Sequence, residues 1–200
     1  MVKKKLKVSP SFSKADDYVT VIRKGIPVKV CEEIVKEIKT RPWEKHIWYN
    51  SKTDSFTSEK TLESQMQTIT SALTDKLHPF ITKALTSYQD KYATYGGKCD
   101  NRWISSFTAP RFNKYTVGNK MRKHYDHIHS IFDGKRKGIP IISIVGTLNE
   151  GYKGARFMLR NKEIKLKTGD ILLFPSVFIY DHLVTEPKKG TRYSFAAWAF

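Results

Sequence analysis

The first half of the chain places hydrophobic residues at the spacing of an amphipathic helix. The segment PVKVCEEIVKEIKT, residues 27–40, predicts one such helix, and Pro27 suits its first turn. Its expected buried face consists of Val30, Ile34, Val35 and Ile38. The preceding segment DDYVTVIRKGIP alternates enough to predict a short strand followed by a turn.

A second helical pattern runs from about Glu59 to Tyr95. Its apolar stripe consists of Leu62, Met66, Ile69, Leu73 and Leu77. Pro79 lacks the amide hydrogen that a helix interior needs, so we expect it to divide the pattern into two helices. The stretch before the pattern, roughly 50–58, is rich in Ser, Thr, Asp and Asn and predicts a mobile loop.

After residue 100 the pattern changes to short runs of branched and aromatic residues between Gly, Pro, Asn, Lys and Asp. The runs are WISSFT, RFNKYTV, IPIISIVGTLN, ARFMLR, EIKL, DILLFPS, FIYDHLV and RYSFAAWAF. About seven or eight strands at such short intervals predict a sandwich or a barrel. Because neither half is large enough to fold comfortably alone, we expect the helices to pack on the outside of the sheet in an α+β fold.

The length of 200 residues favours one domain with a real hydrophobic core. We expect this domain to span 15–200, with helical support over 28–95 and the strands over 100–200. The basic stretch 1–14 lacks the apolar region of a secretory signal and is expected to be a flexible tail. No apolar run is long enough to span a bilayer, so we expect a cytoplasmic protein without a membrane partner.

The net charge of +17 is the strongest anomaly of the composition. It predicts attraction to nucleic acid, an acidic protein or an acidic metabolite, although a lysine-rich surface serves solubility equally well. The charge therefore does not identify the partner.

The two cysteines, Cys31 and Cys99, stand outside any paired motif and are expected to be reduced.

The stretch RKHYDHIHS, residues 122–130, carries three of the six histidines of the chain. In an extended strand, side chains two residues apart share a face, so His124 and Asp126 point together. His182 is a further candidate ligand, between two apolar runs. Two imidazoles and one carboxylate leave metal positions open, as in non-haem Fe(II) oxygenases, whereas structural zinc favours four closed ligands. A charged loop could also contain such a motif by chance.

The other histidines of the chain offer no comparable arrangement. His127 points away from Asp126 if the strand continues, and His129 lies further along the same stretch, so both are expected at a loop or pocket rim. His46 and His78 have no matching partner and are expected to be structural.

The last run, RYSFAAWAF, begins at Arg192, ten residues after His182. Ser194 follows on the same face of the expected strand. An arginine can hold a carboxylate through two parallel hydrogen bonds. Arg192 with Ser194 therefore predicts a clamp for a dicarboxylic co-substrate whose other end chelates iron.

These motifs together resemble the Fe(II)/2-oxoglutarate-dependent dioxygenases, and most closely the prolyl 4-hydroxylase branch. The matching elements are YTVGNKMRKHYD, GTLNEGYKGARFML, KTGDILLFPS and DHLVTEPKKGTRYSFAAWAF, in this order. The resemblance covers about 100–200 well and the helical half only loosely. The sequence departs from the family pattern at residues 153–157, KGARF, where many relatives have a Gly-Gly. In the family this segment lies beside the pocket, so the departure leaves the substrate open and the expected iron site unchanged.

The resemblance implies a double-stranded β-helix, or jelly roll, in the C-terminal half, supported by the N-terminal helices. It implies that His124, Asp126 and His182 bind iron and that Arg192 binds the distal carboxylate of 2-oxoglutarate. The residues expected to assist Arg192 are Tyr115, Thr147 and Ser194. The implied cofactors are Fe(II), 2-oxoglutarate and O2, with ascorbate as an optional addition.

The implied activity is hydroxylation of a C–H bond with release of succinate and carbon dioxide. The first expected substrate is a prolyl residue in a peptide or protein, with an acidic substrate as one option. Alternatives are a 2-oxoglutarate oxygenase acting on nucleic acid or a small molecule, and a non-catalytic jelly-roll binding protein. Trp198 stands where nucleic-acid demethylases of the superfamily carry a second arginine, which disfavours nucleic acid. The four filled positions, His124, Asp126, His182 and Arg192, disfavour a non-catalytic protein.

Overall fold

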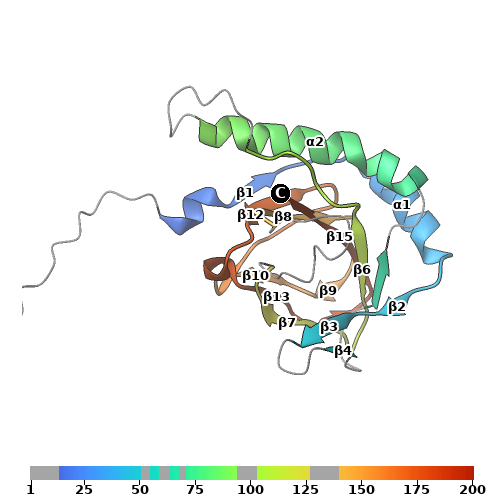
Figure 1. Ribbon diagram of the computed structural model, residues 1–200. Helices are drawn as coiled ribbons and strands as arrows, with labels where there is room; N and C mark the ends of the chain where they lie inside the picture. The colour runs from blue at the N-terminus through green and yellow to red at the C-terminus, as the bar shows by residue number, and fades with distance from the viewer. Residues whose placement is uncertain (1–13, 51–54, 59–63, 68–70, 94–102, 127–139) are drawn as a thin grey trace, which may run out of the picture.

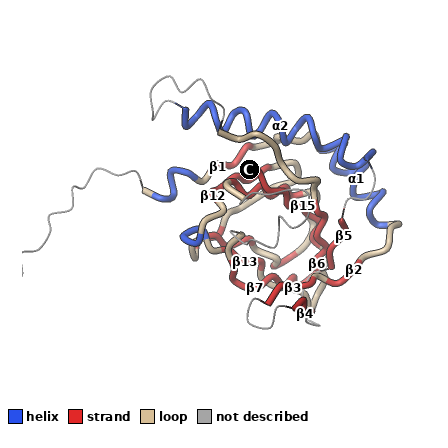
Figure 2. Tube along the Cα trace, in the orientation of Figure 1, coloured by secondary structure: helices blue, strands red, loops and turns tan. Residues whose placement is uncertain are grey.

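The computed structural model describes residues 14–50, 55–58, 64–67, 71–93, 103–126 and 140–200. In this part of the chain, two β-sheets face each other and two helices lie along the outer side of the larger sheet (Figure 1). The same separation is visible in Figure 2, where the helices are blue and the strands red. This is the α+β jelly roll with supporting helices that the sequence predicts.

The larger sheet consists of antiparallel neighbours in the order β1, β12, β8, β15, β6, β5 and β2. Their bounds are Thr20–Ile22 (β1), Ile171–Pro175 (β12), Ile142–Thr147 (β8), Arg192–Ala199 (β15), Arg111–Tyr115 (β6), Ser64–Gln67 (β5) and Glu44–Lys45 (β2). β15 therefore lies at the centre of the sheet, between β8 and β6.

The smaller sheet has the order β11, β10, β13 and β7. Their bounds are Lys162–Glu163 (β11), Phe157–Leu159 (β10), His182–Val184 (β13) and Met121–His124 (β7). Two short pairs complete the described strands: β9 (Lys153–Gly154) with β14 (Pro187–Lys189), and β3 (Ile47–Asn50) with β4 (Ser55–Ser58). Apolar side chains of both sheets fill the space between them: Tyr115, Met121, Val145, Phe157, Leu172, Phe174 and Val184.

The helices α1 (Val28–Lys39) and α2 (Ser71–Ala93) cover the outer face of the larger sheet. α1 forms where the apolar periodicity predicts it, and its buried residues are Cys31, Ile34, Val35 and Ile38. α2 contributes Leu73, Leu77, Ile81, Ala84, Leu85 and Tyr88 to the same core. Along the described part of the chain, neither helix combines the length and the apolar character that a bilayer crossing requires.

β15 is buried on both faces, which explains why its sequence is almost continuously apolar. One face packs in the core beneath the helices with Tyr193, Phe195, Ala197 and Ala199. The other face lines a cavity between the two sheets with Arg192, Ser194, Ala196 and Trp198. Gly146 of β8 lies opposite Phe195, and a Cβ at Gly146 would come within 1.9 Å of the Phe195 ring. A glycine there lets the two central strands pack closely.

The predicted helix from Glu59 to Tyr95 is wrong in its first part. Residues 64–67 form β5, which pairs with β6, and α2 begins at Ser71. Backbone pairing with an existing sheet edge outweighs a helical pattern of apolar residues, because strand formation depends on tertiary neighbours more than helix formation does. Leu62 and Ile69 lie outside the described residues.

Pro79 does not divide the second helix, contrary to the prediction. α2 continues from Ser71 to Ala93 with Pro79 inside it. Pro79 is exposed, and so is Asp75, whose carbonyl would have accepted the missing hydrogen bond. Because this face of the helix is solvated, water can satisfy that carbonyl and the helix persists.

Three other sequence-based expectations differ from the structure. The predicted loop at 50–58 contains β4, while 51–54 lie outside the described residues. The run WISSFT forms no strand beyond a single bridge between Phe107 and Ala199. The run FIYDHLV begins as a 3₁₀ turn, Phe178–Tyr180, before β13 starts. Of the predicted basic tail, only Lys14 belongs to the described residues.

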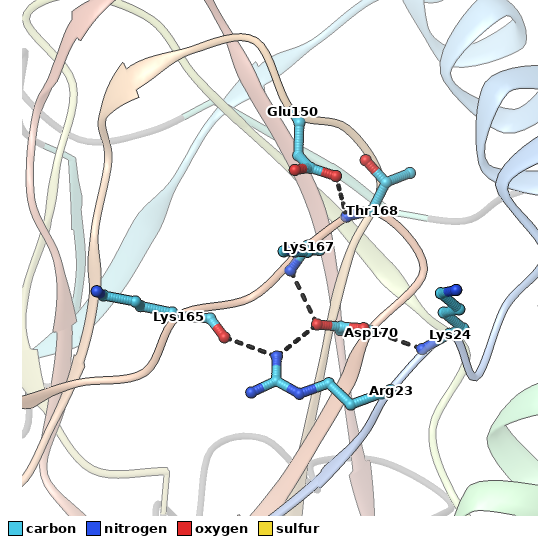
Figure 3. A network of polar contacts seen from close by, with 7 residues as sticks. All are labelled: Arg23, Lys24, Glu150, Lys165, Lys167, Thr168 and Asp170. Carbon is cyan, nitrogen blue, oxygen red and sulfur yellow. Dashed lines mark hydrogen bonds and ion pairs between the residues drawn. The ribbon is translucent and has the colours of Figure 1, made fainter.

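Asp170 ties β1 to the start of β12 through a network of polar contacts (Figure 3). Its carboxylate accepts hydrogen bonds from the Lys24 amide at 2.9 Å, the Lys167 amide at 2.9 Å and Arg23 Nη1 at 2.7 Å. Burial by itself would raise the pKa of Asp170, but the bonds from Lys167, Lys24 and Arg23 hold that pKa below its ordinary value of 3.8. The carboxylate therefore stays ionised and holds the N-terminal strand on the sheet.

The Asp170→Ala variant should lose about 2–4 kcal/mol of unfolding free energy, because the backbone amides of Lys24 and Lys167 and the Arg23 guanidinium lose the buried carboxylate that they share. Thermal and urea unfolding measure this, with Asp16→Ala, which breaks surface ion pairs, as the control that should change little. Since the folded-state pKa is lowered, the contribution is fully present above about pH 4 and is lost as the pH falls through the folded-state pKa. Equal stabilities of Asp170→Ala and wild type at neutral pH would contradict this role.

Candidate active site

The smaller sheet brings two of the predicted metal ligands together. His124 of β7 lies directly opposite His182 of β13 in the antiparallel ladder, and their ring centroids are 4.2 Å apart. Residues in such a pair lie on the same face of the sheet and within contact distance. Two histidines that are 58 positions apart in the sequence therefore meet through strand register.

Asp126 completes the group two residues beyond His124. Its Oδ1 lies 3.4 Å from His124 Nε2 and its Oδ2 lies 3.7 Å from His182 Nε2. The candidate ligand atoms of all three side chains lie within 4.8 Å of one another. Two imidazoles and one carboxylate converging from one side match the ligand set of non-haem Fe(II) sites with open positions.

Backbone carbonyls fix the orientation of both imidazole rings. His124 Nδ1 lies 2.8 Å from the Arg122 carbonyl oxygen, and His182 Nδ1 lies 3.2 Å from the Tyr180 carbonyl oxygen. Because a carbonyl only accepts, each Nδ1 carries the proton and donates it. The Nε2 atoms then carry the lone pairs and lie on the side of Asp126, which is the arrangement that metal-binding histidines use.

Two serines orient the carboxylate of Asp126. Ser143 Oγ donates a hydrogen bond to Asp126 Oδ2 at 2.6 Å, and the Ser143 and Ser176 hydroxyls lie 2.9 Å apart. All three side chains are buried. The sequence-based analysis missed both serines, although a serine inside the apolar run IISIVG was a signal that this position faces something polar.

The charges of the buried ligands suit a cation. Burial would raise the pKa of Asp126, but the interactions with His182, His124 and Ser143 hold that pKa well below its ordinary range. Burial lowers the pKa of His182 to about 4, with the Asp126 carboxylate opposing this shift and His124 and Arg111 adding to it. At neutral pH the site therefore offers an ionised carboxylate and a neutral imidazole at His182, which are the forms that bind metals.

The Ser143→Ala variant should bind Fe(II) or Mn(II) about 10–100-fold more weakly, because residues that orient metal ligands have effects of this size. Calorimetric titration of Mn(II) measures the change. Ser105→Ala is a matched control, since Ser105 Oγ donates to the Phe200 carbonyl outside the cavity. An unchanged affinity in Ser143→Ala would show that Asp126 needs no support from Ser143.

Across the cavity from the smaller sheet, three strands bring together the residues predicted to bind the co-substrate. Arg192 of β15 lies opposite Tyr115 of β6, and its guanidinium carbon is 5.2 Å from the centroid of the Tyr115 ring. Ser194 lies opposite Thr147 of β8. The four side chains are buried at the surface of the same cavity or of the adjoining hollow beyond Thr147.

Arg192 is buried, and no acidic side chain among the described residues forms an ion pair with it. Its residue is 2% exposed, and its Nη2 has no hydrogen-bond partner among the described residues. The Thr147 hydroxyl, on the neighbouring strand β8, is also buried and unpaired within this part of the chain. A buried cation and a buried donor without partners are costly unless a ligand pairs with them. A carboxylate would satisfy both, so these residues fit the distal end of 2-oxoglutarate.

One cavity between the two sheets joins these two groups. Asp126 and the two histidines lie on its wall together with Arg192. Apolar side chains form much of the remaining wall: Met121, Ile144, Val145, Phe157, Val184 and Ala196. The candidate metal centre and the carboxylate clamp thus belong to one site with a largely apolar wall.

The remaining candidate residues lie elsewhere. His46 is buried between β2 and β3, and His78 lies on the exposed side of α2 against the Phe107 ring. Cys31 is a free, buried thiol in the core. The predictions for His127, His129, Cys99 and the run DGKRKG lie outside the described residues.

The family model that describes the 2OG-Fe(II) oxygenase superfamily matches residues 110–200. No curated protein sequence matches the chain. Fe(II), 2-oxoglutarate and O2 are the cofactors of that superfamily, and the cluster of His124, Asp126 and His182 fits the iron.

Several solved structures share the fold. A viral collagen prolyl hydroxylase from Paramecium Bursaria Chlorella virus-1, in complex with 2OG, has a TM-score of 0.62 and 14% identity over 91% of this chain and 94% of that chain. A prolyl hydroxylase from Trichoplax adhaerens, in complex with a hypoxia inducible factor peptide fragment, has a TM-score of 0.65 and 15% identity over 91% and 83%. A Pseudomonas putida prolyl-4-hydroxylase has a TM-score of 0.60 and 15% identity over 90% and 91%.

The fold and the family match agree with each other. The matched residues begin just before β6 and contain the metal cluster, Arg192 and the strands that carry them. Residues 110–200 thus match the 2OG-Fe(II) oxygenase superfamily model, and the chain shares its fold with prolyl hydroxylases, in agreement with the resemblance noted from the sequence.

Proposed function

We propose that the protein is an Fe(II)- and 2-oxoglutarate-dependent dioxygenase that hydroxylates a prolyl residue in a peptide or protein. One observation carries the oxygenase part of this proposal. The same cavity is lined by a 2-His-1-carboxylate cluster and by a buried arginine whose Nη2 has no hydrogen-bond partner among the described residues. The cluster supplies what iron needs, and the arginine supplies what the far end of a dicarboxylic co-substrate needs.

The roles of the individual residues follow from their geometry. His124 and His182 would bind the iron through Nε2, and Asp126 through its carboxylate. Arg192, supported by Thr147, would hold the distal carboxylate of 2-oxoglutarate. When bound, iron and 2-oxoglutarate together supply the oxidising chemistry that turns O2 into a hydroxyl group on the substrate, with succinate and carbon dioxide as co-products.

Three further residues complete the site in this proposal. The ring of Tyr115 lies against the guanidinium of Arg192 and keeps it facing the cavity. Ser194 lies beside Arg192 on the inner face of β15, within reach of the same carboxylate. Phe157 stacks on the His182 ring at a centroid distance of 5.5 Å and shields this ligand from water.

The prolyl substrate is supported by the shared fold. Three structures of similar architecture are prolyl hydroxylases, and one of them was solved with a peptide substrate fragment. The cavity of this chain is open to solvent, and His124 of the candidate metal cluster is partly exposed. A side chain of a bound peptide can therefore reach the cluster while the peptide backbone stays outside.

Succinate formation tests the oxygenase activity. Purified protein is given Fe(II), ascorbate and 2-oxoglutarate, and succinate is measured for wild type, for His124→Ala and for His78→Ala as a matched control outside the cavity. Wild type and His78→Ala should form succinate and His124→Ala should not. Wild-type succinate at the level of His124→Ala would overturn the proposal.

The substrate class is decided by a second measurement on the same preparations. Proline-rich peptides are searched by mass spectrometry for one added oxygen atom, and single- and double-stranded DNA with N-methylated bases for the release of formaldehyde. An added oxygen on proline is the expected result. Because the net charge is +17, release of formaldehyde from DNA is the outcome that would replace a peptide by a nucleic-acid substrate.

A further inference from the structure

β6 presents a second arginine to the cavity, besides the one on β15. Arg111, Asn113 and Tyr115 alternate along this strand, so their side chains share the inner face, and all three line the cavity. The guanidinium carbon of Arg111 lies 5.0 Å from the centroid of the Trp198 ring. The side chain of Arg111 makes no ion pair or hydrogen bond among the described residues, and its Nε is buried without a partner.

Asn113 adds an unpaired acceptor beside this cation. It is 5% exposed, and its Oδ1 has no hydrogen-bond partner in the described part of the chain. Residues two apart in a strand lie roughly 7 Å apart on the same face. A cationic donor and an amide acceptor, both unpaired on one wall, indicate a ligand that carries an anion and an N–H group.

The position of Arg111 separates it from the co-substrate clamp. Arg192 lies opposite Tyr115, at the end of β6. Arg111 is four residues earlier, at the start of this strand, and is therefore roughly 13 Å from Tyr115. Trp198, on which Arg111 stacks, lies opposite Ser143, the residue that holds Asp126. Arg111 therefore lies at the end of the cavity where Ser143 holds Asp126, away from Tyr115.

The co-substrate leaves Arg111 without a partner. In the proposed function, one end of 2-oxoglutarate binds Arg192 and the other end binds at the metal cluster. Both charged ends of that molecule are then accounted for. The charge of Arg111 is available for the second substrate, and contact of one guanidinium face with Trp198 leaves the edge of this planar group for a carboxylate.

We propose that Arg111 and Asn113 form a recognition subsite for the primary substrate, in which Arg111 binds a carboxylate and Asn113 Oδ1 accepts an N–H of the same molecule. This inference rests on the proposed function and names its substrate class. An acidic residue close to the hydroxylated position of a peptide carries both groups. A free amino acid shares this chemistry, and the experiment separates the two sources.

Binding of paired peptide pools tests the subsite. Both pools contain proline, and they differ only in having Asp and Glu or Asn and Gln beside it. Wild-type protein loaded with Mn(II) and 2-oxoglutarate should bind the acidic pool about tenfold more tightly than the amide pool in calorimetry. Arg111→Met should remove this difference, and Arg41→Met, which changes an arginine at the end of α1, should keep it.

The outcomes that would overturn the subsite are clear. One is equal binding of the two pools by wild type, and another is a preference retained in Arg111→Met. Free aspartate and glutamate are titrated in parallel, and tighter binding of these acids than of the peptides assigns the subsite to an amino-acid substrate. Circular dichroism checks the fold of Arg111→Met, and Arg111→Gln serves as a second uncharged variant.

The affinity for 2-oxoglutarate is measured separately, without peptide. Arg111→Met should change it by less than about twofold, while Arg192→Met should weaken it strongly. An equal loss in both variants would assign Arg111 to the co-substrate and overturn the inference. Succinate formation without a preference for acidic peptides would refute the subsite alone. An acidic preference that depends on Arg111, in a protein that forms no succinate, would refute the proposed function alone.

Discussion

Replacing Arg192 by methionine should weaken 2-oxoglutarate binding on the order of a hundredfold and yet stabilise the ligand-free protein. The guanidinium is buried and its Nη2 has no partner among the described residues, so the folded protein holds an uncompensated cation. Methionine fills similar space without a charge. The unfolding free energy should therefore rise by about 1–3 kcal/mol, while the affinity for the co-substrate carboxylate falls.

Two measurements on one preparation check both effects. Calorimetric titration gives the affinity for 2-oxoglutarate in the presence of Mn(II), and thermal unfolding without ligand gives the stability. Arg192→Lys keeps the charge but not the planar fork, so its affinity should fall between those of wild type and Arg192→Met. An unchanged affinity together with a lower melting temperature would show that Arg192 is a structural residue only.

Replacing Asp126 by asparagine should abolish metal binding and lower succinate formation by at least about a thousandfold. Asp126 supplies the only negative charge of the cluster, and its carboxylate lies 3.4 Å from His124 Nε2 and 3.7 Å from His182 Nε2. Asparagine has nearly the same shape, so the fold should survive. The amide cannot neutralise a divalent cation in a buried position.

Mn(II) titration and succinate formation measure this loss. Asp90→Asn is the matched control, because Asp90 is an exposed residue of α2. Circular dichroism confirms the fold of both variants. Retention of Mn(II) affinity in Asp126→Asn would remove Asp126 from the metal centre, whatever the activity.

The candidate site was the most predictable part of the molecule, because its signal is local or has a simple period. His124 and Asp126 share a face in any extended strand, and the structure brings both to His182, the further candidate ligand. Arg192 stands at the start of an apolar run that could only be a strand. Their catalytic roles, and those of Tyr115, Thr147 and Ser194, remain predictions.

Ser143, Arg111 and Asn113 were missed because their significance depends on register. Ser143 matters because it lies beside Asp126, and Arg111 because it stacks on Trp198 of a neighbouring strand. No periodicity along one segment reveals which residue lies opposite another. A polar residue at an inward position of a buried strand is the one sequence signal that all three share.

The errors in secondary structure have a similar origin. Residues 64–67 become a strand through pairing with β6, a partner more than 40 residues away. Pro79 remains inside α2 because that side of the helix faces water. In both cases the surroundings of the segment decide its conformation, and the segment alone indicates something else.

The two faces of β15 have different roles: one packs in the hydrophobic core and the other lines the cavity. Tyr193, Phe195, Ala197 and Ala199 belong to the core beneath the helices, whereas the intervening residues face the cavity. Positions 194, 196 and 198 could therefore be randomised to change which ligands the cavity accepts. Positions 193, 195, 197 and 199, which pack beneath the helices, would be left unchanged to preserve folding. Selectivity and folding would then vary almost independently within eight consecutive residues.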